Sequence, residues 1–220
     1  MELKGKTVNF LGDSITQGSG ASSQEHFYCN VLKEKFGLKC ANNYGIGGTR
    51  FARQQIPSIE SKWDKYFASR VDEMEKDVDA VVVFGGTNDF GHGDAPIGSF
   101  DDRTPDTFYG ACHDLFKRLI EKYAGIPIVV VTPLHRLSED NIQGENGRKG
   151  KDYGTLKDYV DIILEVARYY SLPVCDLFAS SGLQPNVPVI NEKFFADGLH
   201  PNDAGHAAVA DKIGTFLLNL

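Results

Sequence analysis

The sequence has no long hydrophobic run and no excess of positive charge. Its apolar stretches all fall short of the roughly 18 consecutive residues that a membrane-spanning helix needs. Lys and Arg number 23 against 30 Asp and Glu, which gives a formal net charge of −7. Because a nucleic-acid-binding surface normally carries a basic stripe, this charge balance argues against nucleic acid as a partner. The sequence does not indicate the oligomeric state.

Cysteine is scarce, and its spacing excludes two kinds of site. The four residues form neither a CxxC pair nor a metal-ligand pattern: Cys29, Cys40, Cys112 and Cys175. They fall mostly in predicted strands and helices, so we expect small buried hydrophobes rather than a catalytic thiol. Four histidines likewise lack the spacing of a metal site: His92, His113, His135 and His206. We therefore expect no metal and no cofactor.

The first residues of the sequence do not resemble a secretory signal peptide. Residues 1–6 have neither an apolar core nor a small-residue cleavage site. We therefore expect a cytoplasmic protein, while a secreted protein already trimmed of its signal would look the same. With 220 residues, 41% of them hydrophobic, and no linker or internal repeat, residues 1–220 are expected to form one domain.

Short apolar runs alternate with helical patterns along the chain. The runs cover residues 7–11, 38–42, 80–84, 126–132 and 172–176. Apolar residues at three- to four-residue spacing predict helices over residues 27–36, 63–74, 108–123, 156–170 and 202–220, with Thr104-Pro105-Asp106 as the start of the third. This alternation predicts an α/β fold with a parallel sheet between two layers of helices.

Two connections are long, over residues 90–103 and 133–154. Each leaves the carboxyl end of a predicted strand, so both should overhang the same crevice. His135 and Arg136 follow the fourth strand directly and are candidates for substrate binding, although they could equally be solvated. We expect Trp63 to face the core from its helix rather than to form a binding platform.

Ser14 lies two residues after Gly12, where the first predicted strand ends. Asp and Ser are favoured helix N-caps, so a capping role is one interpretation. A nucleophile is the other, because a serine at a helix start lies among free N–H groups that can stabilise an oxyanion. The Gly-x-Ser-x-Gly elbow is not present, since Thr16 stands where its second glycine belongs.

Asp197 and His200 are three residues apart, which can place both side chains on the same side of a turn. The carboxylate could then hold the imidazole in one tautomer and stabilise it when it takes a proton. Pro201 restricts His200 to an extended conformation, as expected of a histidine fixed in a loop before the last helix. A surface turn with a solvated histidine is the alternative.

Two further blocks could supply oxyanion donors. Asn88 follows the third strand, where its amide could donate to a developing negative charge or merely form a turn. Gly48 has no Cβ, so a substrate oxygen could approach its N–H, but an ordinary loop would also use this glycine. A dinucleotide-binding fingerprint is not favoured, because Arg50 stands where its third glycine belongs.

With all four blocks present in order from Gly12 to His200, the chain resembles the GDSL family of serine esterases and lipases, the SGNH hydrolases. Ile15 replaces the leucine of the name motif, which is a mild departure. The resemblance implies a flavodoxin-like three-layer α/β/α sandwich with a five-stranded parallel sheet.

The resemblance also implies roles for individual residues. By analogy, Ser14 is the nucleophile, His200 the general base and Asp197 the acid that orients it. The implied oxyanion hole has three donors: the Ser14 N–H, the Gly48 N–H (or that of Gly47, one residue earlier) and the Asn88 side chain.

These parts predict a serine esterase that works through an acyl-enzyme. The long loops are polar and contain no apolar lid, which favours short acyl groups such as acetyl on a polar alcohol such as a carbohydrate. A lysophospholipase or thioesterase with the same machinery is an alternative. A non-catalytic binding module on the same scaffold is another, since a fold does not fix a function.

Overall fold

The computed structural model describes residues 1–149 and 153–220, and its centre is a five-stranded parallel sheet. The strands are β1 (Thr7–Gly12), β2 (Cys40–Gly45), β3 (Ala80–Phe84), β4 (Ile128–Val131) and β5 (Val174–Cys175). Their spatial order is β2-β1-β3-β4-β5, which is the flavodoxin-like order. The predicted fold class is therefore confirmed.

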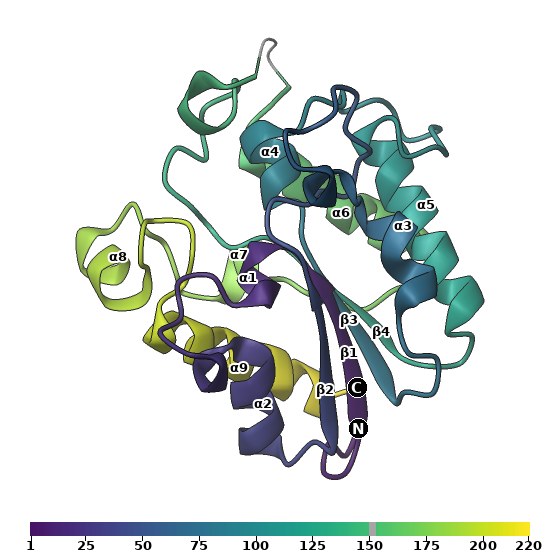
Figure 1. Cartoon of the computed structure of the whole chain (residues 1–220), viewed down its shortest axis with the longest axis vertical. Coiled ribbons are helices and arrows are strands. Elements are labelled where there is room, and N and C mark those ends of the chain that lie inside the picture. The colour runs from purple at the N-terminus through teal and green to yellow at the C-terminus, as the bar shows by residue number, and fades with distance from the viewer. Residues whose placement is uncertain (150–152) are drawn as a thin grey trace.

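Helices cover both faces of the sheet. The two layers are α2 (Tyr28–Phe36) with α9 (Asp203–Leu218), and α3 (Phe67–Arg70) with α5 (Phe108–Lys122) and α6 (Leu156–Tyr169). Figure 1 shows these two layers on opposite sides of the strands. The chain ends lie together at the amino edge of the sheet, where the Met1 ammonium donates to the Leu217 carbonyl oxygen at 3.1 Å.

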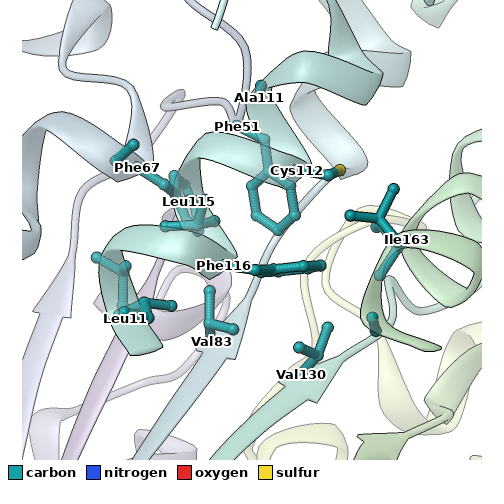
Figure 2. Close-up of a cluster of buried hydrophobic side chains, with 14 of the residues drawn as sticks. Leu11, Phe51, Phe67, Val83, Ala111, Cys112, Leu115, Phe116, Val130 and Ile163 are labelled. Carbon is teal, nitrogen blue, oxygen red and sulfur yellow. The ribbon is translucent and has the colours of Figure 1, made fainter. Parts of the chain in front are cut away.

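The alternation of side chains along the strands divides the core into two clusters. Leu11, Val83 and Val130 point toward α5 and α6, where Phe116 lies above them in Figure 2. Phe10 and Val82, one residue away, point to the opposite face under α2 and α9. Burial on both faces explains why the central strands are continuous apolar runs.

The second strand begins later than its sequence predicts. Residues 38–42 were the expected range, whereas β2 covers Cys40–Gly45 and pairs with β1 through Tyr44 opposite Leu11 and Gly45 opposite Gly12. Gly37, with φ +69°, ends the preceding helix, and the chain then turns before it becomes extended. The polar Asn-Asn-Tyr-Gly stretch is tolerated because β2 is an edge strand that is only half-buried.

The predicted helix over residues 63–74 is wrong, because the chain breaks into three short pieces. These are the 3₁₀ turns η2 (Ser61–Asp64) and η3 (Val71–Glu73), with α3 between them. Tyr66 is extended, with ψ 156°, and the Phe67 N–H donates to the Arg50 carbonyl oxygen at 2.9 Å rather than within a helix. A tertiary hydrogen bond has here overridden the apolar periodicity.

The start of the third predicted helix also differs. Thr107, not Thr104, is the N-cap of α5, and its hydroxyl accepts a hydrogen bond from the Gly110 N–H at 3.1 Å. Asp106 instead pairs with Arg53. In the described residues, no helix has the length and apolar character to cross a membrane.

Candidate active site

Ser14 lies where β1 ends and the short helix α1 (Ser14–Gln17) begins, at the carboxyl edge of the sheet. The Asp13 carboxylate caps this helix by accepting a hydrogen bond from the Ile15 N–H at 3.0 Å. The capping role therefore belongs to Asp13, and the hydroxyl of Ser14 remains available for other bonds. As the first helical residue, Ser14 has an N–H with no partner in its own helix.

The Ser14 hydroxyl contacts the imidazole of His200. Oγ lies 3.0 Å from Nε2 of His200, and Nδ1 of the same ring lies 2.7 Å from Oδ2 of Asp197. His200 is held in a tight loop before α9, since the Ala196 N–H donates to the His200 carbonyl oxygen at 2.9 Å. The structure thus brings together the three residues that the sequence placed in two distant blocks.

The contacts of Asp197 fix the tautomer of His200. Oδ1 of Asp197 accepts hydrogen bonds from the N–H groups of Leu199 and His200, at 3.0 and 2.7 Å. Partial burial alone would raise the pKa of Asp197, but these N–H groups and the imidazole outweigh burial and lower it. An ionised Oδ2 then accepts a hydrogen bond from Nδ1–H, which keeps the ring proton on Nδ1 and leaves Nε2 free to accept the Ser14 proton.

Gly48, rather than Gly47, offers a free N–H beside Ser14. The Gly47 N–H already donates to Oε1 of Gln17 at 2.6 Å. Gly48 lines the pocket with φ +77°, and within the described part of the chain no acceptor contacts its N–H. An added Cβ there would lie 3.2 Å from Cδ1 of Trp63, so only glycine fits this position without displacement.

Asn88 presents its amide to the same pocket from α4 (Thr87–His92). Its Nδ2 donates to the Thr49 carbonyl oxygen at 2.9 Å, and its Oδ1 lies 3.2 Å from Nε2 of His92. Among the described residues, these contacts leave one Nδ2 proton without a partner. Sequence reasoning missed His92, although its position four residues after Asn88 on a helix is the signal that could have identified it.

A cavity of about 560 Å³ opens over Ser14 and His200. Besides Gly48 and Asn88, its lining includes mostly polar and charged side chains: Arg50, Gln54, Trp63, His92, Glu145 and Arg148. Glu145 and Arg148 come from the long connection over residues 133–154, of which residues 150–152 lie outside the described part. The prediction that this connection overhangs the site is confirmed for its described residues.

The prediction that Trp63 faces the core is wrong. Trp63 lies in η2, is half-buried, and forms part of the cavity wall against Gly48. The prediction assumed a continuous helix over residues 63–74, which the chain does not form.

His135 and Arg136 are not among the residues that line the cavity. The imidazole of His135 packs on Phe178 and contacts the Glu139 carboxylate at 2.9 Å. Arg136 is buried, and its guanidinium pairs with Glu145 at 3.0 Å. Their observed contacts are structural: Arg136 holds Glu145 in the cavity wall and also donates to Thr87 at the start of α4.

Buried charges that the sequence did not reveal support the carboxyl edge of the sheet. Arg70 is 2% exposed and donates to the carbonyl oxygens of Gly12, the last residue of β1, and Tyr44, the last but one of β2. Asp89 accepts hydrogen bonds from the N–H groups of Phe51 and Ala52 at 2.9 and 2.8 Å. These contacts fix the loop after β2 that carries Gly48.

The sheet is flavodoxin-like, and a Ser–His–Asp hydrogen-bond chain lies at its carboxyl edge. Together these features define the class: an α/β protein that resembles the serine hydrolases. The model of the GDSL-like lipase/acylhydrolase family matches residues 10–208, and the chain belongs to this family. The predicted resemblance is therefore confirmed. No curated protein matches the chain.

Solved structures show the same architecture. A crystal structure of a Lactobacillus plantarum protein is 29% identical, with a TM-score of 0.83 and 98% of each chain covered. A possible lipase from Chitinophaga pinensis is 22% identical, with a TM-score of 0.68 and coverage of 97% of this chain and 98% of that one. The lipase/acylhydrolase from Enterococcus faecalis is 21% identical, with a TM-score of 0.63 and coverage of 97% and 96%. The last two show a shared fold alone.

Proposed function

We propose that this protein is a serine esterase that hydrolyses carboxylic esters through an acyl-enzyme on Ser14. One observation carries this proposal: Oγ of Ser14, the imidazole of His200 and the carboxylate of Asp197 form a continuous chain, with contacts of 3.0 and 2.7 Å. A binding module has no need for such a chain in its cavity. The membership of the GDSL-like lipase/acylhydrolase family supports the same reaction class.

In the first half of the reaction, Oγ of Ser14 bonds to the carbonyl carbon of the ester while His200 takes its proton at Nε2. The negative charge that develops on the carbonyl oxygen is stabilised by the N–H groups of Ser14 and Gly48 and by Nδ2 of Asn88. The C–O bond to the alcohol then breaks as His200 returns the proton to the departing oxygen.

In the second half, a water molecule attacks the acyl-Ser14 ester and gives a proton to His200. The tetrahedral intermediate uses the same three donors, and its collapse releases the carboxylic acid and restores the Ser14 hydroxyl. Asp197 stabilises the imidazolium in both halves through the bond to Nδ1.

The proposed substrate has a short acyl group, such as acetyl, on a polar alcohol such as a carbohydrate. Two features of the cavity support this class. Oε1 of Gln54 is buried and has no hydrogen-bond partner in the described residues, so a substrate hydroxyl would satisfy it. Trp63 supplies a flat ring in the same wall, on which the apolar face of a sugar could pack.

Apolar residues at the rim favour a second candidate, a lysophospholipase or thioesterase with the same machinery. Ile59 lines the cavity and is 99% exposed, and Ile56 nearby in the chain is 72% exposed. Exposed apolar side chains beside a site could contact a long acyl chain.

A series of p-nitrophenyl esters from acetate to palmitate separates these candidates. We expect kcat/KM to be highest for acetate and to fall along the series, with an acetylated sugar also deacetylated. A preference for acyl groups of about eight carbons or more would support the second candidate and contradict the first. The Ser14→Ala variant is the control, and equal rates for it and the wild type would contradict the esterase proposal itself.

A further inference from the structure

The Asn88 side chain can stabilise an oxyanion only if its amide nitrogen, not its amide oxygen, faces the substrate. The carboxamide has two orientations of nearly equal shape that differ by a half-turn. In the structure Nδ2 lies 2.9 Å from the Thr49 carbonyl oxygen and Oδ1 lies 3.2 Å from Nε2 of His92. The Thr49 carbonyl oxygen can only accept, so it favours the productive orientation. A proton on Nε2 of His92 would hold the other end of the carboxamide in the same orientation, whereas an unprotonated Nε2 would oppose it.

The other side of the His92 ring decides where its proton resides. Nδ1 lies 3.0 Å from Nη1 of Arg50. A guanidinium has donors and no acceptor, so Nδ1 must accept and cannot carry the proton of a neutral ring. The proton is then on Nε2, where it is donated to Oδ1 of Asn88.

Arg50 is itself held firmly, so that it can act as a fixed donor. It is 4% exposed, and its Nη2 donates to the Trp63 carbonyl oxygen at 3.0 Å and lies 3.6 Å from the Asp64 carboxylate. Trp63 lies in η2, just before the break that separates η2 from α3.

Burial, assisted by nearby cations, keeps the His92 ring neutral. Burial and the Arg50 cation lower the pKa of His92 to about 4, and Arg136 and Arg148 act in the same direction. Glu145 opposes them but does not prevail. Across neutral pH the ring therefore stays in the tautomer that donates to Asn88.

We propose that His92 is a positioning residue for the reaction: anchored by Arg50, it holds the Asn88 carboxamide with an Nδ2–H aimed at the oxyanion. Donation to Oδ1 also polarises the carboxamide, which strengthens its N–H as a donor. This inference rests on the proposed esterase function. His92 acts through Asn88 and takes no proton from the substrate.

The test compares His92→Phe, which removes both ring nitrogens, with His92→Gln, which keeps an N–H able to reach Oδ1 of Asn88. With p-nitrophenyl acetate, His92→Phe should lower kcat by about 10- to 100-fold, less than complete loss of an oxyanion donor, with little change in KM. His92→Gln should remain within a few-fold of the wild type. Thermal melting of both variants monitors the fold.

A double-mutant cycle shows whether the effect passes through Asn88. In the Asn88→Ala background, His92→Phe should cause almost no further loss of kcat, because the amide that it positions is gone. A full second loss in the double variant would overturn the inference and indicate a general structural role. So would wild-type kcat for His92→Phe alone.

The tautomer can be measured without turnover. In long-range ¹H–¹⁵N NMR spectra at neutral pH, His92 should carry its proton on Nε2, and a proton on Nδ1 would overturn the inference. Kinetics separate this outcome from a failure of the proposed function. Equal activity of the wild type and Ser14→Ala contradicts the esterase, whereas a wild-type rate for His92→Phe with an inactive Ser14→Ala contradicts only the role of His92.

Discussion

Oγ of Ser14 lies 3.0 Å from Nε2 of His200, although 186 residues separate them in the sequence. A second histidine helps to hold the two segments together. The Tyr28 N–H donates to Nδ1 of His206 at 3.2 Å, so Nε2 of His206 carries the proton and donates to the Ser19 carbonyl oxygen at 3.1 Å. The loop that follows α1 is thereby tied to α9, whose preceding loop carries His200.

Removal of the Asn88 amide should lower kcat without unfolding the protein. One oxyanion donor contributes about 2.7–4 kcal/mol to the stabilisation of the transition state, so Asn88→Ala should reduce kcat about 10²- to 10³-fold. Steady-state kinetics with p-nitrophenyl acetate measure this loss, and thermal melting checks the fold. A loss of less than about threefold would contradict the assignment of Asn88 as a donor.

Asp197→Asn should impair His200 by forcing the wrong tautomer. The N–H groups of Leu199 and His200 both face Oδ1, so they would orient the new carboxamide with its oxygen toward them and its NH₂ toward Nδ1 of His200. Nδ1 must then accept, the ring proton moves to Nε2, and Ser14 loses its base. We expect kcat to fall by about 10²- to 10⁴-fold, and activity close to the wild type would contradict this role.

Burial of Asp13 should make stability depend on pH. Burial raises its pKa to about 6, while the Ile15 N–H, His200 and Arg70 oppose this shift. In the unfolded chain this carboxyl has a pKa of about 3.9, so between pH ~4 and ~6 the folded protein binds more protons than the unfolded chain. The contribution of Asp13 to the free energy of unfolding therefore rises as the pH falls from about 6 to about 4. Asp13→Asn keeps an oxygen for Ile15, and should be more stable than the wild type at pH ~7.5 by about 1–3 kcal/mol.

Urea denaturation at both pH values tests this, and the advantage of Asp13→Asn should largely vanish near pH ~4.5. An advantage that is equal at both pH values would contradict the prediction. Asp79 is the matched control, because the Thr7 N–H and Lys6 lower the pKa of this half-exposed carboxylate. Asp79→Asn should therefore destabilise the protein at neutral pH, in the opposite direction.

The cysteines should differ in reactivity. Three are buried, and burial raises the pKa of Cys175 to about 11 and those of Cys29 and Cys112 further. Cys40 is half-buried on the edge strand. Ellman's reagent should modify no more than one thiol in the native protein and all four after denaturation. In Cys40→Ser the native reaction should disappear, and its persistence would show that a buried thiol is accessible.

Much of the candidate site could be predicted because parallel strands end at one edge of the sheet. Ser14, Gly48 and Asn88 each follow a different strand, and β2, β1 and β3 are neighbours in the observed order. Local sequence marks these positions through glycine and turn residues, and the sheet topology brings them together. Predictions based on strand ends therefore agree with the structure for these three residues, but not for His135 and Arg136, which follow β4 and do not line the cavity.

The walls of the cavity could not be predicted in the same way. Trp63 lies in an apolar pattern typical of a helix, which tertiary hydrogen bonds such as that from the Phe67 N–H to the Arg50 carbonyl oxygen interrupt. Arg50 comes from the loop after β2 and contacts the Trp63 carbonyl oxygen. The tautomer of His92 is set by its contact with Arg50, which is distant in the sequence. No local sequence pattern predicts that contact. Contacts of this kind depend on the packed structure rather than on residue type or spacing.

Covalent labelling measures the reactivity of Ser14 most directly. A fluorophosphonate probe should add one mass equivalent to the wild-type protein, with peptide mapping placing it on Ser14. Labelling should be much slower in His200→Ala, which lacks the base, and Ser14→Ala should show no adduct. A wild-type protein that hydrolyses esters yet acquires no probe at Ser14 would contradict the account.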